Sequence, residues 1–358
     1  MSRLTRADLD ALPAYVPGRN VADLARELGI AEAIKLASNE VPFGPLPGVP
    51  EAVAAAMTQS HRYPDMGALE LRDRLAARYG VSPDRIVTGC GSVALAEHLA
   101  KATCLPGDEI VYSWRSFEAY PIISAGVGAV SIRVPNTPEH GHDLRAMADA
   151  ITDRTRLVFV CTPNNPTGTS LRKAELDRFL DAVPSDLLVV LDEAYREFVT
   201  DVEVPDGLAT YGDRPNVVVL RTLSKAWGLA GLRIGYLVAQ PEIAAAIRKV
   251  LTPFSTSLVA QAAALAALDA EQEMIRRCAL VISERERVTE ALRKLHADVP
   301  TSQANFVWLP LGDQSAAFGA ACEKRGVIVR PFPGDGVRIT IGKPEENDAL
   351  LAAAEAAL

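Results

Sequence analysis

One lysine, Lys225, stands between two strongly apolar runs in the second half of the chain. The run before it, NVVVLR (216–221), is typical of a buried parallel strand, and the run after it, LRIGYLVA (232–239), predicts a second one. An ammonium group between buried strands is costly unless it finds a partner. A covalent imine between the amine and a carbonyl cofactor would remove that cost. The alternative is a lysine at the rim of a sheet whose ammonium reaches solvent.

Donor groups suited to a phosphate surround this lysine in the sequence. Thr222 and Ser224 supply two hydroxyls, and Arg233 supplies a guanidinium. Such groups form strong hydrogen bonds with phosphate oxygens. Because pyridoxal phosphate carries both an aldehyde and a phosphate, Lys225 and these three residues together predict pyridoxal phosphate as the cofactor.

A carboxylate ends the apolar run LLVVLD, whose last residue is Asp192. In an open α/β sheet, ligands bind at the carboxyl ends of the strands, and a buried carboxylate there needs a cationic partner. The protonated pyridine nitrogen of the cofactor is such a partner. Tyr195, and Asn165 after the neighbouring strand, could then donate hydrogen bonds to the ring oxygen beside the imine. The alternative for Asp192 is a helix cap after a strand.

A strand, a glycine turn and a helix are predicted in succession by DRIVTGCGSVALAEHLAKAT (84–103). The backbone N–H groups of a helix N-terminus bind anions, so Gly89, Gly91 and Ser92 are candidates to surround the phosphate, and Val93 beside them is a further candidate contact. The turn lacks the GxGxxG spacing, and an ordinary turn between strand and helix stays open. Farther along, Phe117 lies in an aromatic stretch, where it would either stack on the cofactor ring or fill core space.

Two arginines in the C-terminal part are candidates to bind a substrate carboxylate. Arg330 lies in the strand-like piece VIVRPFP and Arg338 in GVRITIG, and a fixed guanidinium suits a carboxylate. Either could instead be a surface charge. Asn39, in the proline- and glycine-rich stretch IKLASNEVPFGP, would either reach a ligand or cap a turn.

The order of the predicted elements supplies a sheet that could position these residues. Strand and helix patterns alternate over 36–250, which predicts an α/β fold with a large cofactor-binding domain, its mostly parallel sheet flanked by helices. Helices and short strands over 251–358 predict a smaller α+β domain. Residues 1–35 are expected to form an N-terminal arm that packs with the small domain. The length of 358 residues suits two domains of unequal size.

The composition indicates which classes of partner and which cell compartment to expect. The 37 basic and 45 acidic residues give a formal charge of −8 without long runs of either sign, which argues against nucleic acid as a partner. The five cysteines lack the spacing of a zinc site or a disulfide framework, so no metal is expected. The sequence shows neither a run long enough for a membrane span nor a signal-peptide pattern. We therefore expect a cytoplasmic protein that acts on small molecules.

Nearly the whole chain carries a series of motifs in a fixed order: KLASNEVPFGP, HRYPD, PNNPTGT, DEAY, TLSKAWGLAGLRIGY, SQANFVW and GVRITIG. This series resembles the fold type I pyridoxal phosphate aminotransferases, and within them the histidinol-phosphate aminotransferase branch. The resemblance implies that Lys225 forms the imine, that Asp192 meets the pyridine nitrogen, and that Arg338 binds the substrate carboxylate. It also implies phosphate contacts from Ser92, Thr222, Ser224 and Arg233, a stacking role for Phe117, and contacts to the ring oxygen from Asn165 and Tyr195.

The same resemblance implies a homodimer with active sites at the subunit interface. In the family's pattern, Tyr63 contacts the cofactor phosphate of the partner subunit. Tyr15, Asn39 and Asn305 fall at substrate-side positions. The residues that meet the substrate are thus expected to come from distant parts of the chain.

One segment departs from the histidinol-phosphate branch. Where those enzymes commonly have Pro-Thr-aromatic, this chain has WRSF (114–117), which is similar to the actinobacterial aromatic amino acid aminotransferases. Phe43, Trp114 and Phe332 also suit an aromatic ring better than a phosphate. We therefore expect ping-pong amino transfer between an aromatic amino acid and a 2-oxo acid such as 2-oxoglutarate. Histidinol phosphate, whose phosphate Arg330 could bind, is the alternative, and a lyase of the same fold would share the cofactor residues.

Overall fold

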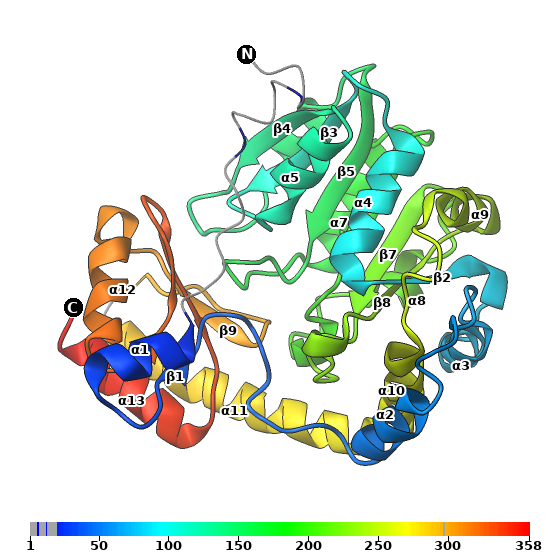
Figure 1. Cartoon of the computed structure of the whole chain (residues 1–358). Helices are drawn as coiled ribbons and strands as arrows, with labels where there is room; N and C mark the ends of the chain where they lie inside the picture. The colour runs from blue at the N-terminus through cyan, green and yellow to red at the C-terminus, as the bar shows by residue number, and fades with distance from the viewer. Residues whose placement is uncertain (1–5, 7–11, 13–19, 296–297) are drawn as a thin grey trace.

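Seven strands form the central sheet, in the order β2-β8-β7-β6-β5-β3-β4 (Figure 1). The computed structural model describes Arg6, Leu12 and residues 20–295 and 298–358. The strands of this sheet are β2 (Ile86–Gly89), β3 (Glu109–Trp114), β4 (Val130–Pro135), β5 (Thr155–Cys161), β6 (Leu188–Asp192), β7 (Val217–Thr222) and β8 (Gly235–Val238). Neighbours pair in parallel except at β8, which is antiparallel to both β2 and β7. The predicted α/β class with a mostly parallel sheet is confirmed.

The strand after Lys225 differs from the parallel strand expected from its apolar pattern. β8 pairs antiparallel with β7, with Gly235 opposite Thr222. A parallel partner needs a crossover connection, usually a helix. The described chain between β7 and β8 contains, as regular structure, only the short 3₁₀-helix η4 (Ala230–Leu232). It therefore turns back at the carboxyl end of β7, which keeps Lys225 at the edge of the sheet.

Helices cover both faces of the central sheet. One face packs against α4 (Gly91–Thr103), α5 (Ala119–Gly126) and α9 (Pro241–Val250), and the other against α3 (Leu69–Tyr79), α6 (Leu144–Asp149), α7 (Lys173–Ala182) and α8 (Gly207–Tyr211). Along β6, Val190 faces the first group, whereas Val189 and Leu191 face the second, as strand geometry requires. Because both faces are covered, the central strands are apolar until they end.

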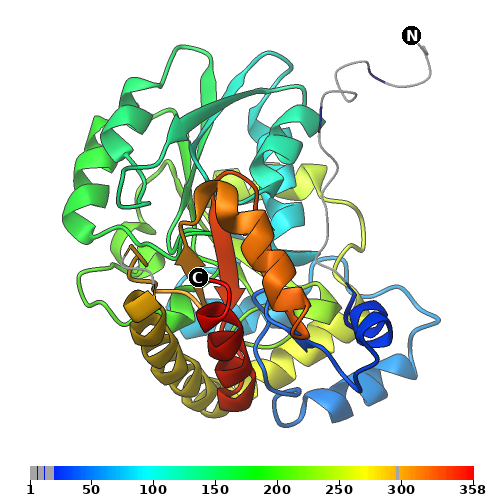
Figure 2. The same ribbon diagram turned by 90° about the vertical axis from the view of Figure 1, so that its left-hand side faces the viewer.

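A smaller group of strands and helices packs beside this sheet. β9 (Phe306–Leu309), β11 (Arg330–Phe332) and β12 (Gly336–Thr340) form an antiparallel sheet, flanked by α12 (Ser315–Glu323) and α13 (Pro344–Glu355). The piece VIVRPFP is divided into β10 (Val327–Ile328) and β11, because β10 pairs instead with β1 (Ile34–Lys35). Figure 2 shows α13 beside the long helix α11 (Glu271–Leu295).

Two segments bear on the domain limits. α1 (Val21–Leu28) packs with the small group, since Leu24 shares a buried cluster with Ile328. α10 (Leu258–Asp269) packs on α2 (Val49–Met57) and α3, and α11 runs from there toward α13 (Figure 1). The domain limits at residues 35 and 250 stay predictions. Within the described part of the chain, no helix has both the length and the apolar character needed to span a membrane.

Candidate active site

A cavity of about 200 Å³ lies at the carboxyl ends of β5, β6 and β7, with walls from the central sheet and from the small group of strands. It brings together most of the residues singled out from the sequence: Asn39, Ser92, Val93, Phe117, Asn165, Asp192, Tyr195, Thr222, Ser224, Lys225, Arg233, Arg330 and Arg338. Asn305 lies just behind this wall, where its Nδ2 donates a hydrogen bond to the Asn39 carbonyl oxygen at 3.0 Å.

Lys225 lies in the turn after β7 with its amine directed into the cavity wall. Its Nζ donates a hydrogen bond to the Ser38 carbonyl oxygen at 3.2 Å. Desolvation, followed by the positive charge of Arg338, lowers the pKa of Lys225 from 10.5 to about 7. Such a pKa does not fit an ammonium that reaches bulk solvent. It leaves part of the amine unprotonated at neutral pH, as a nucleophile or base requires.

Asp192, the last residue of β6, presents a buried carboxylate. Its Oδ2 accepts a hydrogen bond from the Tyr120 hydroxyl at 2.7 Å. Its Oδ1 has no hydrogen-bond partner among the described residues. Burial raises the pKa of Asp192 to about 6, as expected of a carboxylate that lacks a close cation. A cationic N–H at Oδ1 would satisfy this oxygen and pair its charge.

A site for an anion is formed where α4 begins. Gly91 has a φ of 79°, and a Cβ at this position would lie 2.5 Å from Nη2 of Arg233. A Cβ at Gly235 would lie 2.6 Å from the backbone nitrogen of Ser92. The two glycines therefore allow the Arg233 guanidinium and the helix N-terminus to approach the same space. Ser224 belongs to it too, since its Oγ accepts a hydrogen bond from Arg233 at 3.4 Å. This donor set suits a phosphate.

Arg338 and Tyr195 present polar groups on the opposite side of the cavity. Arg338 donates hydrogen bonds to Oδ1 of Asn165 and to the Ala37 carbonyl oxygen, both at 2.6 Å. The Tyr195 hydroxyl accepts a hydrogen bond from Nδ2 of Asn39 at 2.9 Å. Burial raises the pKa of Tyr195 above its usual value, so its hydroxyl stays protonated and can donate. The guanidinium is thus fixed in the wall by two partners, as a carboxylate-binding group needs.

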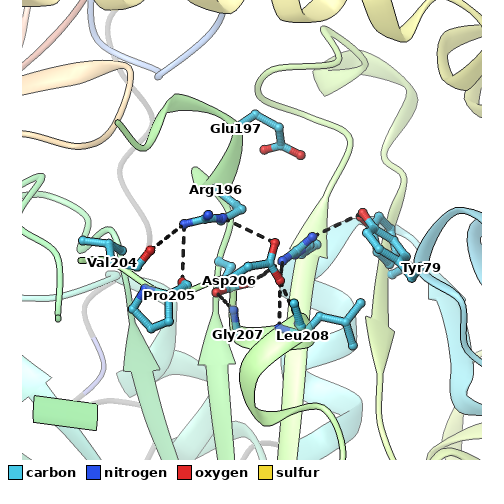
Figure 3. Close-up of polar contacts among 12 residues, drawn as sticks. Tyr79, Arg196, Glu197, Val204, Pro205, Asp206, Gly207 and Leu208 are labelled. Carbon is cyan, nitrogen blue, oxygen red and sulfur yellow. Dashed lines mark hydrogen bonds and ion pairs between the residues drawn. The ribbon is translucent and has the colours of Figure 1, made fainter. Parts of the chain in front are cut away.

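A buried ion-pair network lies next to the cavity, at the ends of β6 and β7. Glu193, which follows the last residue of β6, accepts hydrogen bonds from Arg221, the penultimate residue of β7, with a closest N···O distance of 2.7 Å. Asp206 also pairs with Arg221, at 2.9 Å. Figure 3 shows Arg196 facing Asp206 in this network, with Tyr79 at its edge. Removing one member would leave a buried charge uncompensated, so the network ties together the two strand ends that carry the cavity residues.

Tyr63 and Tyr15 are two of the predicted site residues that are not among the described residues lining this cavity. Tyr63 is 81% exposed and stacks on Phe254 with ring centroids 4.6 Å apart. It does not line the cavity of its own chain, so its role as a contact to a partner subunit stays a prediction. Tyr15 lies outside the described residues.

The expected aromatic walls are only partly present. Phe117 lines the cavity, but Phe43, Trp114 and Phe332 do not. The Arg115 guanidinium instead lies over the rings of Trp114 and Phe332, 4.5 and 5.6 Å from their centroids. These two rings therefore pack against a cation next to the cavity.

Sequence reasoning missed the contributions of Tyr120, Ser38 and Glu118. Tyr120 carried a signal, because it belongs to the same aromatic stretch as Phe117, and the two rings are in contact with centroids 5.5 Å apart. Ser38 contributes a backbone carbonyl oxygen, for which the residue type gives no indication. Glu118 lines the cavity and pairs with Arg330, a contact between distant segments that no local pattern indicates.

Comparison with known proteins gives matches over nearly the whole chain. A family model described as aminotransferase class I and II matches residues 31–353. A protein of Streptomyces coelicolor named aromatic amino acid aminotransferase is 57% identical over 350 residues, which cover 98% of this chain and 96% of that protein. A protein of Rhodococcus jostii with the same name is 54% identical over 352 residues, covering 98% and 95%.

Solved structures show the same fold. Histidinol-phosphate aminotransferase from Sinorhizobium meliloti in complex with pyridoxal-5'-phosphate superposes with a TM-score of 0.88 at 29% identity, covering 100% of this chain and 98% of that chain. A mutant of Thermus thermophilus aspartate aminotransferase has a TM-score of 0.82 at 24% identity, with both chains fully covered.

Proposed function

We propose that this chain, which belongs to the class I and II aminotransferases, transfers an amino group between an aromatic amino acid and a 2-oxo acid such as 2-oxoglutarate. The observation that carries the proposal is the convergence of Lys225, Asp192 and Arg338 on one cavity. The choice of substrate is supported by relatives at 54% and 57% identity that carry the name aromatic amino acid aminotransferase.

Pyridoxal phosphate is the cofactor, and the residues present fit it. Lys225 supplies an amine for its aldehyde, and the partnerless Oδ1 of Asp192 can accept the hydrogen bond of its pyridine N–H. Arg233 and Ser224, next to the N-terminus of α4, can hold its phosphate. When bound, the cofactor supplies an electron-withdrawing ring that acidifies the Cα–H bond of the attached substrate. Ser92, Val93, Thr222 and Phe117 complete the proposed cofactor contacts.

The protein's own groups then orient the substrate and move its proton. Lys225 Nζ, once free, can take the Cα proton, because its burial favours the unprotonated amine that a base needs. Since Oδ1 of Asn165 accepts from Arg338, Nδ2 is the group that Asn165 can offer to the cofactor's ring oxygen, beside the Tyr195 hydroxyl. Arg338 fixes the substrate carboxylate, so that the Cα–H bond is held near Lys225.

Replacement of Arg338 tests whether the preferred donor carries a carboxylate. Arg338→Ala should lower kcat/KM for phenylalanine or tyrosine. The loss of transition-state stabilisation should be about 2–4 kcal/mol, because a charged hydrogen bond in a closed site is lost. Histidinol phosphate has no carboxylate and should lose less. Steady-state rates with both donors measure the difference, and an equal loss for the two would show that Arg338 does not bind the carboxylate.

Product analysis separates amino transfer from a lyase reaction on the same cofactor. With phenylalanine and 2-oxoglutarate, each phenylalanine consumed should give one phenylpyruvate and one glutamate. Release of carbon dioxide in proportion to the phenylalanine consumed, without glutamate, would contradict the proposed function.

We also propose that the protein is a cytoplasmic homodimer in which Tyr63 contacts the phosphate of the partner's cofactor. Tyr63, Met66, Leu69 and Phe254 are exposed, although large apolar side chains are unfavourable in water. A second copy of the chain that covers them would remove this cost. It would also bring Tyr63, which does not line the cavity of its own chain, to the cavity of the second copy.

Subunit mixing tests the position of Tyr63. Tyr63→Ala alone should weaken cofactor binding by about 1.5–3 kcal/mol, the usual cost of losing a hydrogen bond to a charged group. When Tyr63→Ala and Lys225→Ala subunits are refolded together at low cofactor concentration, mixed dimers should contain one intact site. Activity should then recover to about a quarter of the wild-type value, given random pairing in a symmetric dimer. No recovery, despite mixed dimers in native mass spectra, would place Tyr63 in its own subunit's site.

A further inference from the structure

Two ion pairs join the segment 114–118 to the hairpin of β11 and β12. Arg330 on β11 pairs with Glu118 at 3.0 Å. Arg115 pairs with Asp335, in the turn of the hairpin, at 2.8 Å. Only the first pair belongs to the cavity, since Glu118 and Arg330 line it and the other two residues do not. The Glu118 carboxylate is therefore part of the substrate's surroundings.

The position of Glu118 at the start of α5 would allow a different role. An acidic residue before a helix commonly caps the free backbone N–H groups there. The side chain of Glu118 makes no such hydrogen bond to α5. Instead both of its carboxylate oxygens accept from Nη2 of Arg330, at 3.2 and 3.0 Å. Its charge is thus directed across the cavity wall and away from its own helix.

Arg330 lies next to the group that binds the substrate carboxylate. It is directly opposite Arg338 on the neighbouring antiparallel strand, so the two side chains share a face of the small sheet. Both guanidinium groups lie over the Phe332 ring, 5.6 and 5.8 Å from its centroid. With the carboxylate on Arg338 and the amino nitrogen near Lys225, the rest of the substrate must lie among the lining residues outside the cofactor contacts, which include Glu118 and Arg330.

We propose that Glu118 is a specificity-determining residue. By pairing with Arg330 it withholds that guanidinium from a distal anion, so that donors with an uncharged ring are favoured over donors that end in a phosphate. A dianion there would have to displace the Glu118 carboxylate and would lie close to its like charge. This inference rests on the proposed amino transfer and adds how the site rejects one class of donor.

Replacement of Glu118 by its neutral isostere tests the inference. In Glu118→Gln holoenzyme, the half-reaction with each donor is followed by the absorbance change of the cofactor, which avoids the second substrate. The efficiency ratio of histidinol phosphate to phenylalanine should rise about tenfold or more, as for removal of a like charge from a partly buried site. The variant should also have a lower KM for 2-oxoglutarate, whose distal carboxylate competes with Glu118.

Asp335→Asn is the matched control. It removes a carboxylate from the other ion pair between the same two segments, but outside the cavity. Its efficiency ratio should stay within about twofold of the wild-type ratio, as for a change away from the site. If Asp335→Asn raises the ratio as much as Glu118→Gln does, the effect comes from loosening the two segments and the proposal is wrong.

A double variant shows whether the gain depends on Arg330. Glu118→Gln/Arg330→Gln should lose the gain in histidinol phosphate efficiency, since the guanidinium that would attract the distal phosphate is absent. An unchanged ratio in Glu118→Gln, with normal cofactor absorbance and an unchanged melting temperature, would overturn the proposal. A wild-type enzyme that prefers histidinol phosphate would instead contradict the proposed function, so the two failures are distinct.

Discussion

Lys225→Ala should lose amino transfer on the order of 10⁵-fold, the size of effect seen when a central catalytic group is deleted. The variant removes both the amine that holds the cofactor and the base that can take the Cα proton. The phosphate donors remain, so it should still bind pyridoxal phosphate non-covalently. Steady-state rates with phenylalanine measure the loss. Lys173→Ala, which removes an exposed lysine of α7 paired with Asp177, should keep wild-type activity.

Borohydride reduction locates the cofactor independently of activity. The wild-type protein should be yellow, lose its visible absorbance on reduction, and carry the cofactor's mass on the peptide containing Lys225. Lys225→Ala should acquire no such label. A label on another lysine, or substantial turnover in the variant, would show that Lys225 is not the attachment site.

Asp192→Ala should have the second largest effect, a loss of about 3–5 kcal/mol in transition-state stabilisation, as for other buried charges that lose their partner. The variant leaves the pyridine nitrogen without a counter-charge, so the ring is less often protonated and withdraws electrons less well. The loss should appear in kcat at saturating cofactor. Near wild-type turnover in Asp192→Ala would reduce the carboxylate to a structural role.

Tyr120→Phe is the matched comparison for Asp192. It removes the hydrogen bond to Oδ2 but keeps the carboxylate, so the expected loss is smaller, about 1.5–3 kcal/mol. A loss as large as that of Asp192→Ala would mean that the hydroxyl acts on the reaction directly.

The sequence was most informative where strands end. Asp192 and Asn165 were predicted at one edge because apolar runs covered on both faces turn polar only at their ends. The predicted parallel direction of β8 was wrong, because a buried apolar run has the same pattern in parallel and antiparallel pairing. Only the connection before the strand distinguishes the two directions. The pairing of Glu118 with Arg330 could not be predicted, because it joins segments 212 residues apart in sequence.

Arg221 and Glu193 show a further limit of sequence reasoning. Each adjoins a residue singled out from the sequence, yet each points to the opposite face of the sheet and into a buried ion pair. Period-two alternation could have separated the two faces. It could not have shown that the two charges meet, because that depends on which strands are neighbours.

Values of kcat/KM for phenylalanine and histidinol phosphate, measured side by side on the wild-type enzyme with 2-oxoglutarate as acceptor, test most directly whether the protein transfers amino groups from aromatic amino acids. The cavity offers a carboxylate-binding Arg338, and its Arg330 is paired with Glu118. We therefore expect phenylalanine to be the better donor. A wide preference for histidinol phosphate would contradict the aromatic assignment and put the histidinol-phosphate reaction in its place.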